Sequence, residues 1–255
     1  MSCQLDRTQK KRIVHSFSRA VPTYRARATV QRDVARVLVS YLSRYCHKLS
    51  SIIEFGAGTG LLSDMVIDRF ATAHVTLIDI TPAMVELLRQ RYRSRASIDC
   101  VVADMSDFSS SLSYDLVLSS FTLHWGRDVG EILSHWSSLL SEKGVIAFSI
   151  PLKGSCGSLH DEYNFSEEEL FLSSETLECL FPKDMTLIVR KICSFSEVFD
   201  SPLHCLRALR EIGGAVPFHR LGKYFSSLLR LRRWEKKSFI CPWNVGFYML
   251  QKGSA

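Results

Sequence analysis

The chain has 255 residues, enough for one large domain, and 46% of them are hydrophobic, enough to bury a full core. No apolar run approaches the ~20 residues that a membrane span requires, and the polar, basic N-terminus has no secretory-signal pattern. We therefore expect a cytoplasmic protein with no membrane association. The eight cysteines form no CxxC pair, so we predict free thiols in a reducing compartment.

Charge is concentrated in two segments. The formal net charge is +6, yet residues 1–36 and residues 201–240 each carry a net +7, so the rest of the chain is acidic. This segregation favours an acidic binding partner, and a solvated basic face is the alternative interpretation. The eight histidines form no HxH or HExxH pattern, so we predict no metal site.

Apolar segments alternate with helical patterns through the first 150 residues. An apolar stripe predicts a helix over 29–42, formed by Val30, Val34, Val37, Leu38, Tyr41 and Leu42. In chain order, the pattern then predicts strands at 51–55, 75–78, 98–102, 115–119 and 145–150, with helices at 61–70, 82–93 and 129–140. This alternation is typical of a doubly wound parallel sheet, whose ligands bind beyond the carboxyl ends of its strands.

The last third of the chain is organised differently. Residues 186–198 and 244–252 are predicted strands, and a long helical segment lies between them. This arrangement suits an α/β sheet finished by an antiparallel pair, with residues 201–240 inserted as a lid.

The strongest local motif is the glycine-rich turn Glu54-Phe55-Gly56-Ala57-Gly58-Thr59-Gly60, between a predicted strand and a helix. Glycine is needed where the backbone turns tightly and a ligand approaches without a Cβ in the way. The pattern is GxGxG, with Leu61 where a dinucleotide fingerprint has its third glycine, and no GK[ST] follows. The turn alone is weak evidence for any one ligand.

Acidic residues at neighbouring strand ends narrow the choice of ligand. Asp79 ends the second strand at the position expected to accept hydrogen bonds from ribose hydroxyls, and Asp104 ends the third. Together with Glu54, these carboxylates disfavour a pyrophosphate and suit a cationic ligand with a free ribose. In the alternative interpretation, Asp79 and Asp104 are simple helix N-caps.

Residues 48–150 therefore resemble the seven-stranded, Rossmann-like methyltransferases that use S-adenosylmethionine (SAM). The resemblance implies an antiparallel last strand and four segments: an N-terminal helical substrate cap (1–47), a SAM-binding core (48–200), an inserted helical lid (201–240) and a final strand (241–255). It implies SAM as the cofactor. The residues it assigns to cofactor binding are Glu54, Gly56, Gly58, Gly60, Asp79, Ile80, Asp104, Met105 and Ser119.

Four further segments resemble the malonyl-[acyl-carrier protein] O-methyltransferases of biotin synthesis. They are Val14 to Ala20 with Tyr24, Tyr114 to Trp125, Lys153 to His160, and Leu206 to Ala215. The sequence departs from the family pattern at Glu54-Phe55-Gly56-Ala57-Gly58, where D-x-G-C-G is commoner, and at Arg210, where the family has Lys. Residues 222–241 match poorly, which leaves the lid undefined.

The resemblance implies methylation of the free carboxylate of a malonyl thioester, which needs no general base because it is ionised at pH 7. We predict Tyr24 and His124 as positioning donors, Trp125 as an apolar wall and Arg19 as the first contact for the carboxylate. Trp125 as a core residue and His124 as a loop cap are the alternative interpretations. The predicted partner is an acidic acyl carrier protein, docked by Arg207, Arg210, Arg220, Lys223, Arg230 and Arg233.

Three other functions are compatible with a SAM fold. One is methylation of a small carboxylic acid or a quinone precursor, and another is a non-catalytic partner subunit. A nucleic-acid methyltransferase is disfavoured, because Ser119-Ser120-Phe121-Thr122 stands where base-methylating enzymes have [DNS]-P-P-[FY]. We therefore predict no nucleic-acid partner.

Overall fold

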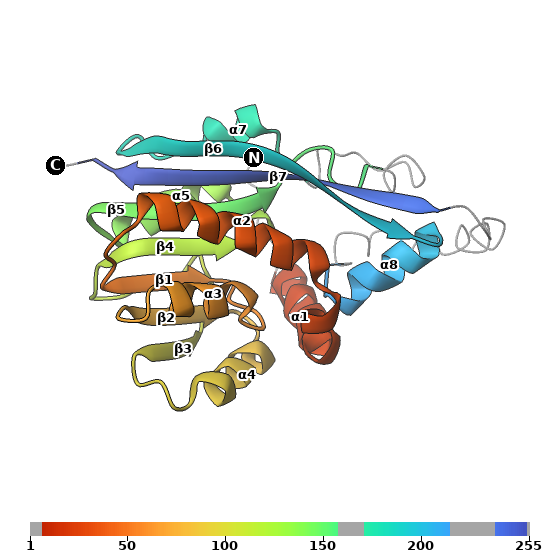
Figure 1. The fold of residues 1–255 in the computed structure, drawn as a ribbon, viewed down its shortest axis with the longest axis horizontal. Helices are drawn as coiled ribbons and strands as arrows, with labels where there is room; N and C mark the ends of the chain where they lie inside the picture. The colour runs from red at the N-terminus through yellow and green to blue at the C-terminus, as the bar shows by residue number, and fades with distance from the viewer. Residues whose placement is uncertain (1–6, 158–170, 215–237, 254–255) are drawn as a thin grey trace.

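A seven-stranded sheet forms the centre of the computed structural model, which describes residues 7–157, 171–214 and 238–253 (Figure 1). The strand order is β3-β2-β1-β4-β5-β7-β6. The strands are β1 (Ser51–Phe55), β2 (His74–Asp79), β3 (Ile98–Val102), β4 (Tyr114–Ser120), β5 (Leu140–Pro151), β6 (Met185–Phe199) and β7 (Phe239–Lys252). β7 pairs antiparallel with both β5 and β6, and the other pairs are parallel. The predicted fold class, including its antiparallel last strand, is confirmed.

Helices cover both faces of the sheet. The helical elements are α1 (Arg7–Arg27), α2 (Thr29–Tyr45), α3 (Leu61–Arg69), α4 (Pro82–Tyr92), the 3-10 turn η1 (Leu123–Trp125), α5 (Val129–Ser138), α7 (Ser174–Glu178) and α8 (Pro202–Glu211). Ile52 belongs to the core cluster shared with α2, α3 and α4, whereas its neighbour Ile53 belongs to the cluster shared with α5 and α7. Successive strand residues point to opposite faces, so the continuous apolar run of β1 is buried on both sides.

Several element boundaries differ from the sequence prediction, and the strands β5 and β7 both begin earlier than expected. The helix expected to reach residue 140 ends at Ser138, because Leu140 pairs with Tyr114 and starts β5 there. The final strand begins at Phe239 rather than Asn244, because its pairing with β6 continues to the register Phe199↔Phe239. Between Phe239 and Asn244, β7 pairs with β6 alone, so the two strands extend past β5 as a ribbon (Figure 1).

The ribbon carries α8 to the end of the molecule where α1 lies (Figure 1). The Ser16 hydroxyl donates to the Gly213 carbonyl (3.1 Å), and the Thr23 hydroxyl donates to the Glu211 carbonyl (2.7 Å). These bonds join the N-terminal helix to the start of the predicted lid. Of the lid, α8 and residues 212–214 and 238–240 are described, and the segment 215–237 lies outside the described residues.

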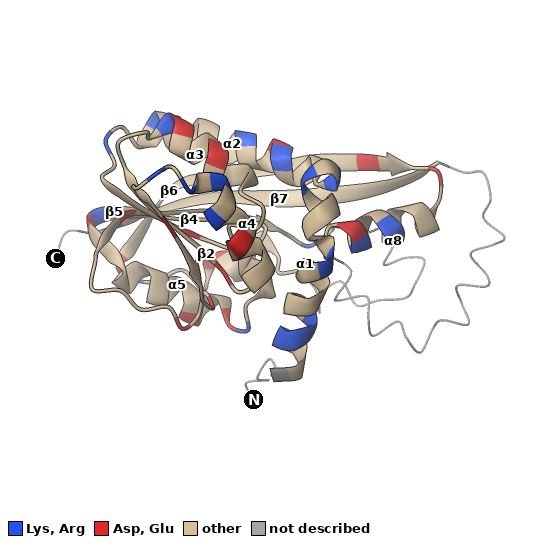
Figure 2. Ribbon diagram, turned by 90° about the horizontal axis from the view of Figure 1, so that it is seen from below, with Lys and Arg blue, Asp and Glu red and all other residues tan. Residues whose placement is uncertain are grey.

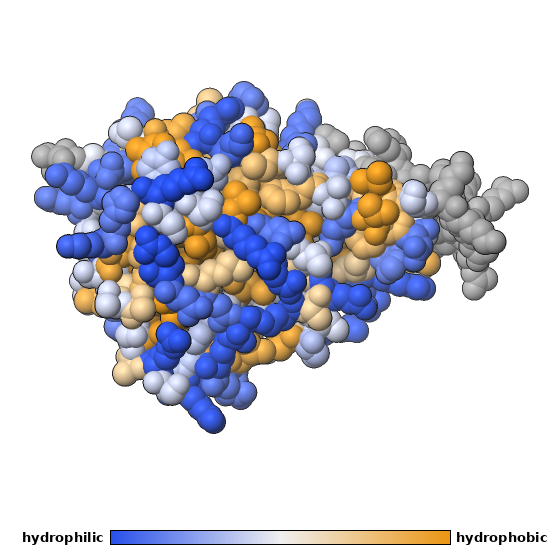
Figure 3. All heavy atoms as spheres, viewed as in Figure 1, coloured by the Kyte–Doolittle hydropathy of each residue, from blue (hydrophilic) through white to orange (hydrophobic). Residues whose placement is uncertain are grey.

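The surface is mostly hydrophilic on the face shown in Figure 3, with apolar patches between polar side chains. The ribbon exposes one apolar cross-strand pair, Val198 and Ile240. Among the helices that the structure describes, none combines the length and apolarity needed to traverse a bilayer.

Trp136 connects the core to the loop that follows β3. Its ring is buried and stacks on Phe55 at 4.9 Å between centroids, and its indole N–H donates to the Met105 carbonyl (3.1 Å). Trp136→Phe keeps an aromatic ring against Phe55 but leaves that carbonyl without its donor. We expect this substitution to lower the free energy of unfolding by about 1–3 kcal/mol, measured by urea denaturation. Unchanged stability would show that the bond to Met105 contributes nothing.

Candidate functional site

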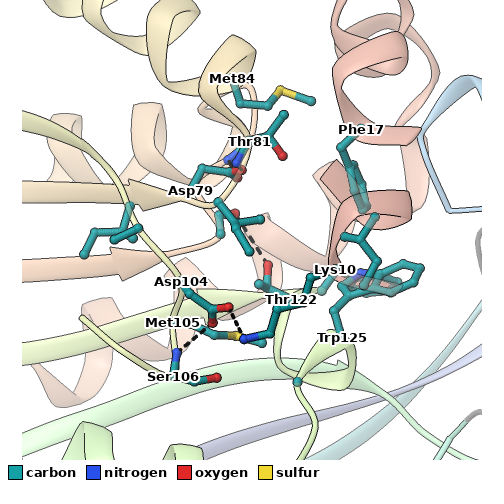
Figure 4. Close-up of a pocket in the computed structure, with 18 of the residues that line it drawn as sticks. Lys10, Phe17, Asp79, Thr81, Met84, Asp104, Met105, Ser106, Thr122 and Trp125 are labelled. Atoms are coloured by element: carbon teal, nitrogen blue, oxygen red, sulfur yellow. Dashed lines mark hydrogen bonds and ion pairs between the residues drawn. The ribbon is translucent and has the colours of Figure 1, made fainter. Parts of the chain in front are cut away.

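A cavity opens where the parallel strands end, and α1 forms its outer wall (Figure 4). Its walls come from the loops after β1, β2, β3 and β4. The lining residues are Lys10, Ile13, Phe17, Tyr24, Gly56, Gly58, Ile78, Asp79, Ile80, Thr81, Met84, Ala103, Asp104, Met105, Ser106, Ser120, Phe121, Thr122, Trp125, Gly126 and Arg127. This is the location that a doubly wound sheet predicts for its ligand.

The glycine-rich loop forms the floor of the cavity. Gly56, Gly58 and Gly60 have φ values of +74°, +54° and +80°, a region that side chains rarely adopt. A Cβ on Gly56 would lie 2.1 Å from the Thr122 hydroxyl, so this position admits no side chain. A Cβ on Gly58 would meet no atom closer than 3.9 Å, which leaves the backbone there open to a ligand.

Asp79 is buried at the end of β2 and lines the cavity. Its Oδ2 accepts from the Gly58 N–H (2.9 Å), and its Oδ1 accepts from the Thr81 N–H (2.8 Å). Burial raises the pKa of Asp79, and the two backbone donors oppose that shift. Each oxygen retains a lone pair that can accept a further hydrogen bond from a ligand hydroxyl.

Asp104 lies at the next strand end and pairs with α1 (Figure 4). Its Oδ2 is 2.7 Å from Lys10 Nζ, and its Oδ1 accepts from the Ser106 N–H (2.9 Å). Burial alone would raise the pKa of Asp104, but the bonds from Lys10 and Ser106 outweigh it and hold the pKa below its ordinary value. Asp104 is therefore an anion that is partly neutralised by a residue of the cavity wall.

Glu54 lies beneath the glycine-rich loop rather than on the cavity wall. Its side chain is buried and accepts from the Ser63 hydroxyl (2.7 Å). Burial raises the pKa of Glu54 to about 8, and the neighbouring Asp64 and Asp79 add to the rise while Ser63 opposes it. Glu54 is thus largely protonated at pH 7.

The other residues predicted to bind the cofactor divide between the wall and the supporting layer. Ile80 and Met105 line the cavity. Gly60 is the N-cap of α3, and a Cβ there would lie 2.9 Å from the Tyr92 hydroxyl. Ser119 is buried and donates to the Phe55 carbonyl (3.0 Å), which ties β4 to β1 below the loop.

The residues predicted to act on the substrate are also divided. Tyr24 and Trp125 line the cavity, and the Tyr24 hydroxyl has no hydrogen-bond partner among the described residues. Burial and the charge of Asp79 raise the pKa of Tyr24, so its hydroxyl stays protonated. His124 lies behind Trp125, with its ring 4.9 Å from the indole ring, and burial lowers its pKa to about 3. Its Nδ1 is buried without a partner.

Arg19 is exposed and does not line the cavity. Each helical residue turns by about 100°, so Arg19 lies about 200° from Phe17, on the far side of α1. The same periodicity groups the cavity-lining residues of α1, which are Lys10, Ile13, Phe17 and Tyr24. The sequence analysis did not predict Lys10 and Phe17 as site residues. Their spacing from Tyr24 places all three on one face if residues 7–27 form a helix.

A cluster around Asp64 supports the loop from outside. Asp64 accepts from Arg91 Nε (2.9 Å) and Nη2 (2.7 Å), from the Tyr92 hydroxyl (2.6 Å) and from Arg25 Nη2 (2.5 Å). Arg25 Nη1 also donates to the Thr59 carbonyl (3.1 Å). Burial alone would raise the pKa of Asp64, but these donors outweigh it and lower the pKa. Sequence reasoning missed this cluster because its members come from three separate helices.

Known proteins resemble this chain in both sequence and fold. A family model described as "Methyltransferase domain" matches residues 53–146. Malonyl-[acyl-carrier protein] O-methyltransferase 1 of Ilyobacter polytropus is 30% identical over 211 residues, which cover 80% of this chain and 78% of the relative. The enzyme named malonyl-[acyl-carrier protein] O-methyltransferase in Neorickettsia risticii is 30% identical over 208 residues, covering 79% of this chain and 81% of the relative. The chain belongs to this methyltransferase family.

The structural neighbours agree on the fold. The N-methyltransferase NodS from Bradyrhizobium japonicum, solved with S-adenosylhomocysteine, superposes with a TM-score of 0.57 over 87% of this chain and 86% of its own, at 13% identity. The protein is thus a SAM-dependent methyltransferase by family and by fold. In the described part of the chain, no group of three or more His, Cys, Asp or Glu residues could hold a metal ion.

The glycine positions provide a matched test of the floor of this methyltransferase cavity. Gly56→Ala places a Cβ within 2.1 Å of Thr122, whereas Gly58→Ala meets nothing nearer than 3.9 Å. Both variants strain a positive φ by about 1 kcal/mol. Because the added Cβ of Gly58→Ala enters the open cavity, we expect calorimetry to show weaker S-adenosylhomocysteine binding and urea denaturation to show a small loss of stability. We expect Gly56→Ala to lower both binding and stability strongly, because its Cβ clashes with the protein itself. Unchanged binding in Gly58→Ala would mean that the ligand does not approach this backbone.

Glu54 predicts a pH dependence of stability. The unfolded chain releases this proton near pH 4.5 and the folded protein near pH 8, so wild-type stability falls as pH rises through that window. Glu54→Gln carries no such proton. We expect the free energy of unfolding of the variant to rise relative to that of wild type between pH 5 and pH 8, by on the order of 3 kcal/mol. Urea denaturation at a series of pH values measures this difference. Parallel pH profiles for the two proteins would place the Glu54 pKa outside this window.

Proposed function

We propose that this protein transfers a methyl group from SAM to the free carboxylate of a malonyl thioester on acyl carrier protein, an early step of biotin synthesis. The observation that carries the proposal is the cavity itself, in which Gly58, Asp79 and Asp104 occupy adjacent strand ends. The relatives of the same family, which are named for that substrate, specify the acyl group. We place the reaction in the cytoplasm, where carrier-bound acyl groups are made.

The residues on the wall fit SAM. The exposed backbone at Gly58 admits the amino-acid part, and the free lone pairs of Asp79 suit the two ribose hydroxyls. Asp104 and the backbone of Met105 are proposed to receive the adenine amine, between the apolar side chains of Ile80 and Met105. Glu54, Gly60 and Ser119 support this arrangement from the layer beneath.

The reaction places few chemical demands on the protein. SAM supplies a methyl group on a sulfonium, so the C–O bond forms as the C–S bond breaks and its electron pair passes to sulfur. The carboxylate is already ionised, so no residue has to remove a proton. Holding the carboxylate in line can contribute roughly 7–11 kcal/mol in favourable cases. Phe17 and Trp125 form a T-shaped pair on the cavity wall, with ring centroids 5.6 Å apart, and we propose that this pair excludes water from the substrate.

Tyr24 is the proposed positioning donor. It lines the cavity, it stays protonated, and its hydroxyl has no partner among the described residues, so it can donate to a substrate oxygen. We propose that neutral His124 acts only through Trp125, as a positioning residue. Arg19 points away from the cavity, whereas Arg127 lines its described wall. We therefore propose Arg127, rather than Arg19, as the residue that attracts the substrate carboxylate.

Product mass tests the proposed activity. Incubation with SAM and malonyl-acyl carrier protein should add one methyl group to the carrier-bound malonyl group, as measured by intact-protein mass spectrometry. Methylation of only a free small acid or a quinone precursor would establish a different substrate. SAM binding without transfer to any acceptor would instead indicate a non-catalytic partner subunit.

The Tyr24 hydroxyl has a separate kinetic test. A hydrogen bond to a charged group contributes about 1.5–3 kcal/mol, so Tyr24→Phe should lower kcat/KM by about 10–100-fold. S-adenosylhomocysteine affinity, measured by calorimetry, should stay unchanged. Tyr24→Leu, which also removes the ring, serves as the reference for complete loss of the side chain. Unchanged turnover in Tyr24→Phe would remove the hydroxyl from the mechanism.

A further inference from the structure

Helix α1 separates two kinds of side chain onto opposite faces. The inner face carries the cavity-lining residues Phe17 and Tyr24, and the adjoining face contacts α8 through Ser16 and Thr23. The outer face carries Lys11, Arg12 and Arg19, all exposed. At about 100° per residue, these three cations fall within one sector of about 100°, centred roughly opposite the cavity.

Within residues 7–157, 171–214 and 238–253, no acidic side chain pairs with this outer face. No Asp or Glu occurs anywhere in α1, and Figure 2 shows the helix marked only by basic residues. Three other cations of the helix are paired, since Lys10 contacts Asp104, Arg25 contacts Asp64 and Arg27 contacts Glu211. Lys11, Arg12 and Arg19 form no ion pair with any residue that the structure describes. We call these three residues the basic stripe.

The basic stripe gives the outer face of α1 a local positive potential. Its three cations are exposed on one side of the helix and have no ion-pair partner among the described residues. Such a surface attracts a partner of opposite charge.

We propose that the basic stripe docks an acidic face of the acyl carrier protein. The inference rests on the proposed function and identifies the surface used by its protein substrate. Lys11 and Arg19 are eight residues apart, so the stripe spans about 12 Å along the helix, the length of a short acidic helix face. From there a thioester arm has to pass around α1 to reach the cavity, a path of about 16–19 Å for a helix about 10–12 Å in diameter.

The basic stripe also explains two features of the sequence prediction. The outward orientation of Arg19 fits a docking role, but it does not fit the predicted contact with the substrate carboxylate. Two of the docking residues predicted in the lid, Arg207 and Arg210, are exposed on α8. Because the end of α8 packs against α1, these two arginines can extend the basic stripe. Arg220, Lys223, Arg230 and Arg233 lie outside the described residues.

The test is a triple charge reversal, Lys11→Glu with Arg12→Glu and Arg19→Glu. The matched control reverses Arg44, Lys48 and Lys183, which are exposed before the starts of β1 and β6, at the end of the sheet opposite the cavity. For malonyl-acyl carrier protein we expect KM to rise at least about tenfold in the first variant and to stay within about twofold in the control. Affinity for S-adenosylhomocysteine and KM for a short malonyl-pantetheine thioester should not change in either.

Two further measurements separate the explanations. Raising the salt concentration should lower kcat/KM for the carrier substrate in wild type and much less in the triple variant. Wild-type KM values in the triple variant would overturn the inference, as would an equal rise for the short thioester, which would return Arg19 to the substrate site. A defect found only in Arg207→Glu/Arg210→Glu would overturn it in favour of α8.

Failure of the proposed function is a distinct result. If wild type methylates no malonyl-acyl carrier protein, the substrate assignment is wrong, and the stripe is then tested by the anisotropy of labelled carrier protein. Binding of a single-stranded RNA or of anionic vesicles with higher affinity than the carrier, lost in the triple variant, would assign the stripe to that partner and overturn the inference.

Discussion

The buried carboxylate of Asp79 holds the cavity floor and one of its walls together. It accepts one hydrogen bond from the glycine-rich loop after β1 and another from the start of α4 after β2. Both donors are loop amides at the beginning of a turn, which would be unsatisfied in a buried site without it. Since Gly56 also fits against Thr122, the loop after β4 takes its position from the same floor.

Helix α1 closes the other side and depends on that floor. Lys10 fastens the beginning of the helix to Asp104, and Arg25 fastens its end to Asp64 and to the Thr59 carbonyl. The phenol of Tyr24 is therefore carried by a helix whose two ends are tied to the loops that form the cavity. One element thus serves as cavity wall, as support for the glycine-rich loop and, in our proposal, as the outer docking surface.

Residue patterns were sufficient for the sheet and for much of the cavity. Apolar runs buried on both faces identified the parallel strands, and the order of glycines and acids after them located Gly56, Asp79 and Asp104 where the strands end. The pairs Lys10–Asp104 and Arg25–Asp64 could not be predicted, because they depend on how α1 packs across loops distant in sequence. The orientation of Arg19 could have been predicted from helical periodicity alone.

The three carboxylates at adjacent strand ends cannot all remain charged and unpaired in one buried region. The structure resolves the conflict differently for each. Glu54 is protonated, with its pKa raised to about 8, Asp79 is held by two backbone donors, and Asp104 is paired with Lys10. A cationic ligand on the floor would favour the ionised form of Glu54, so cofactor binding and the charge of this buried acid are thermodynamically coupled.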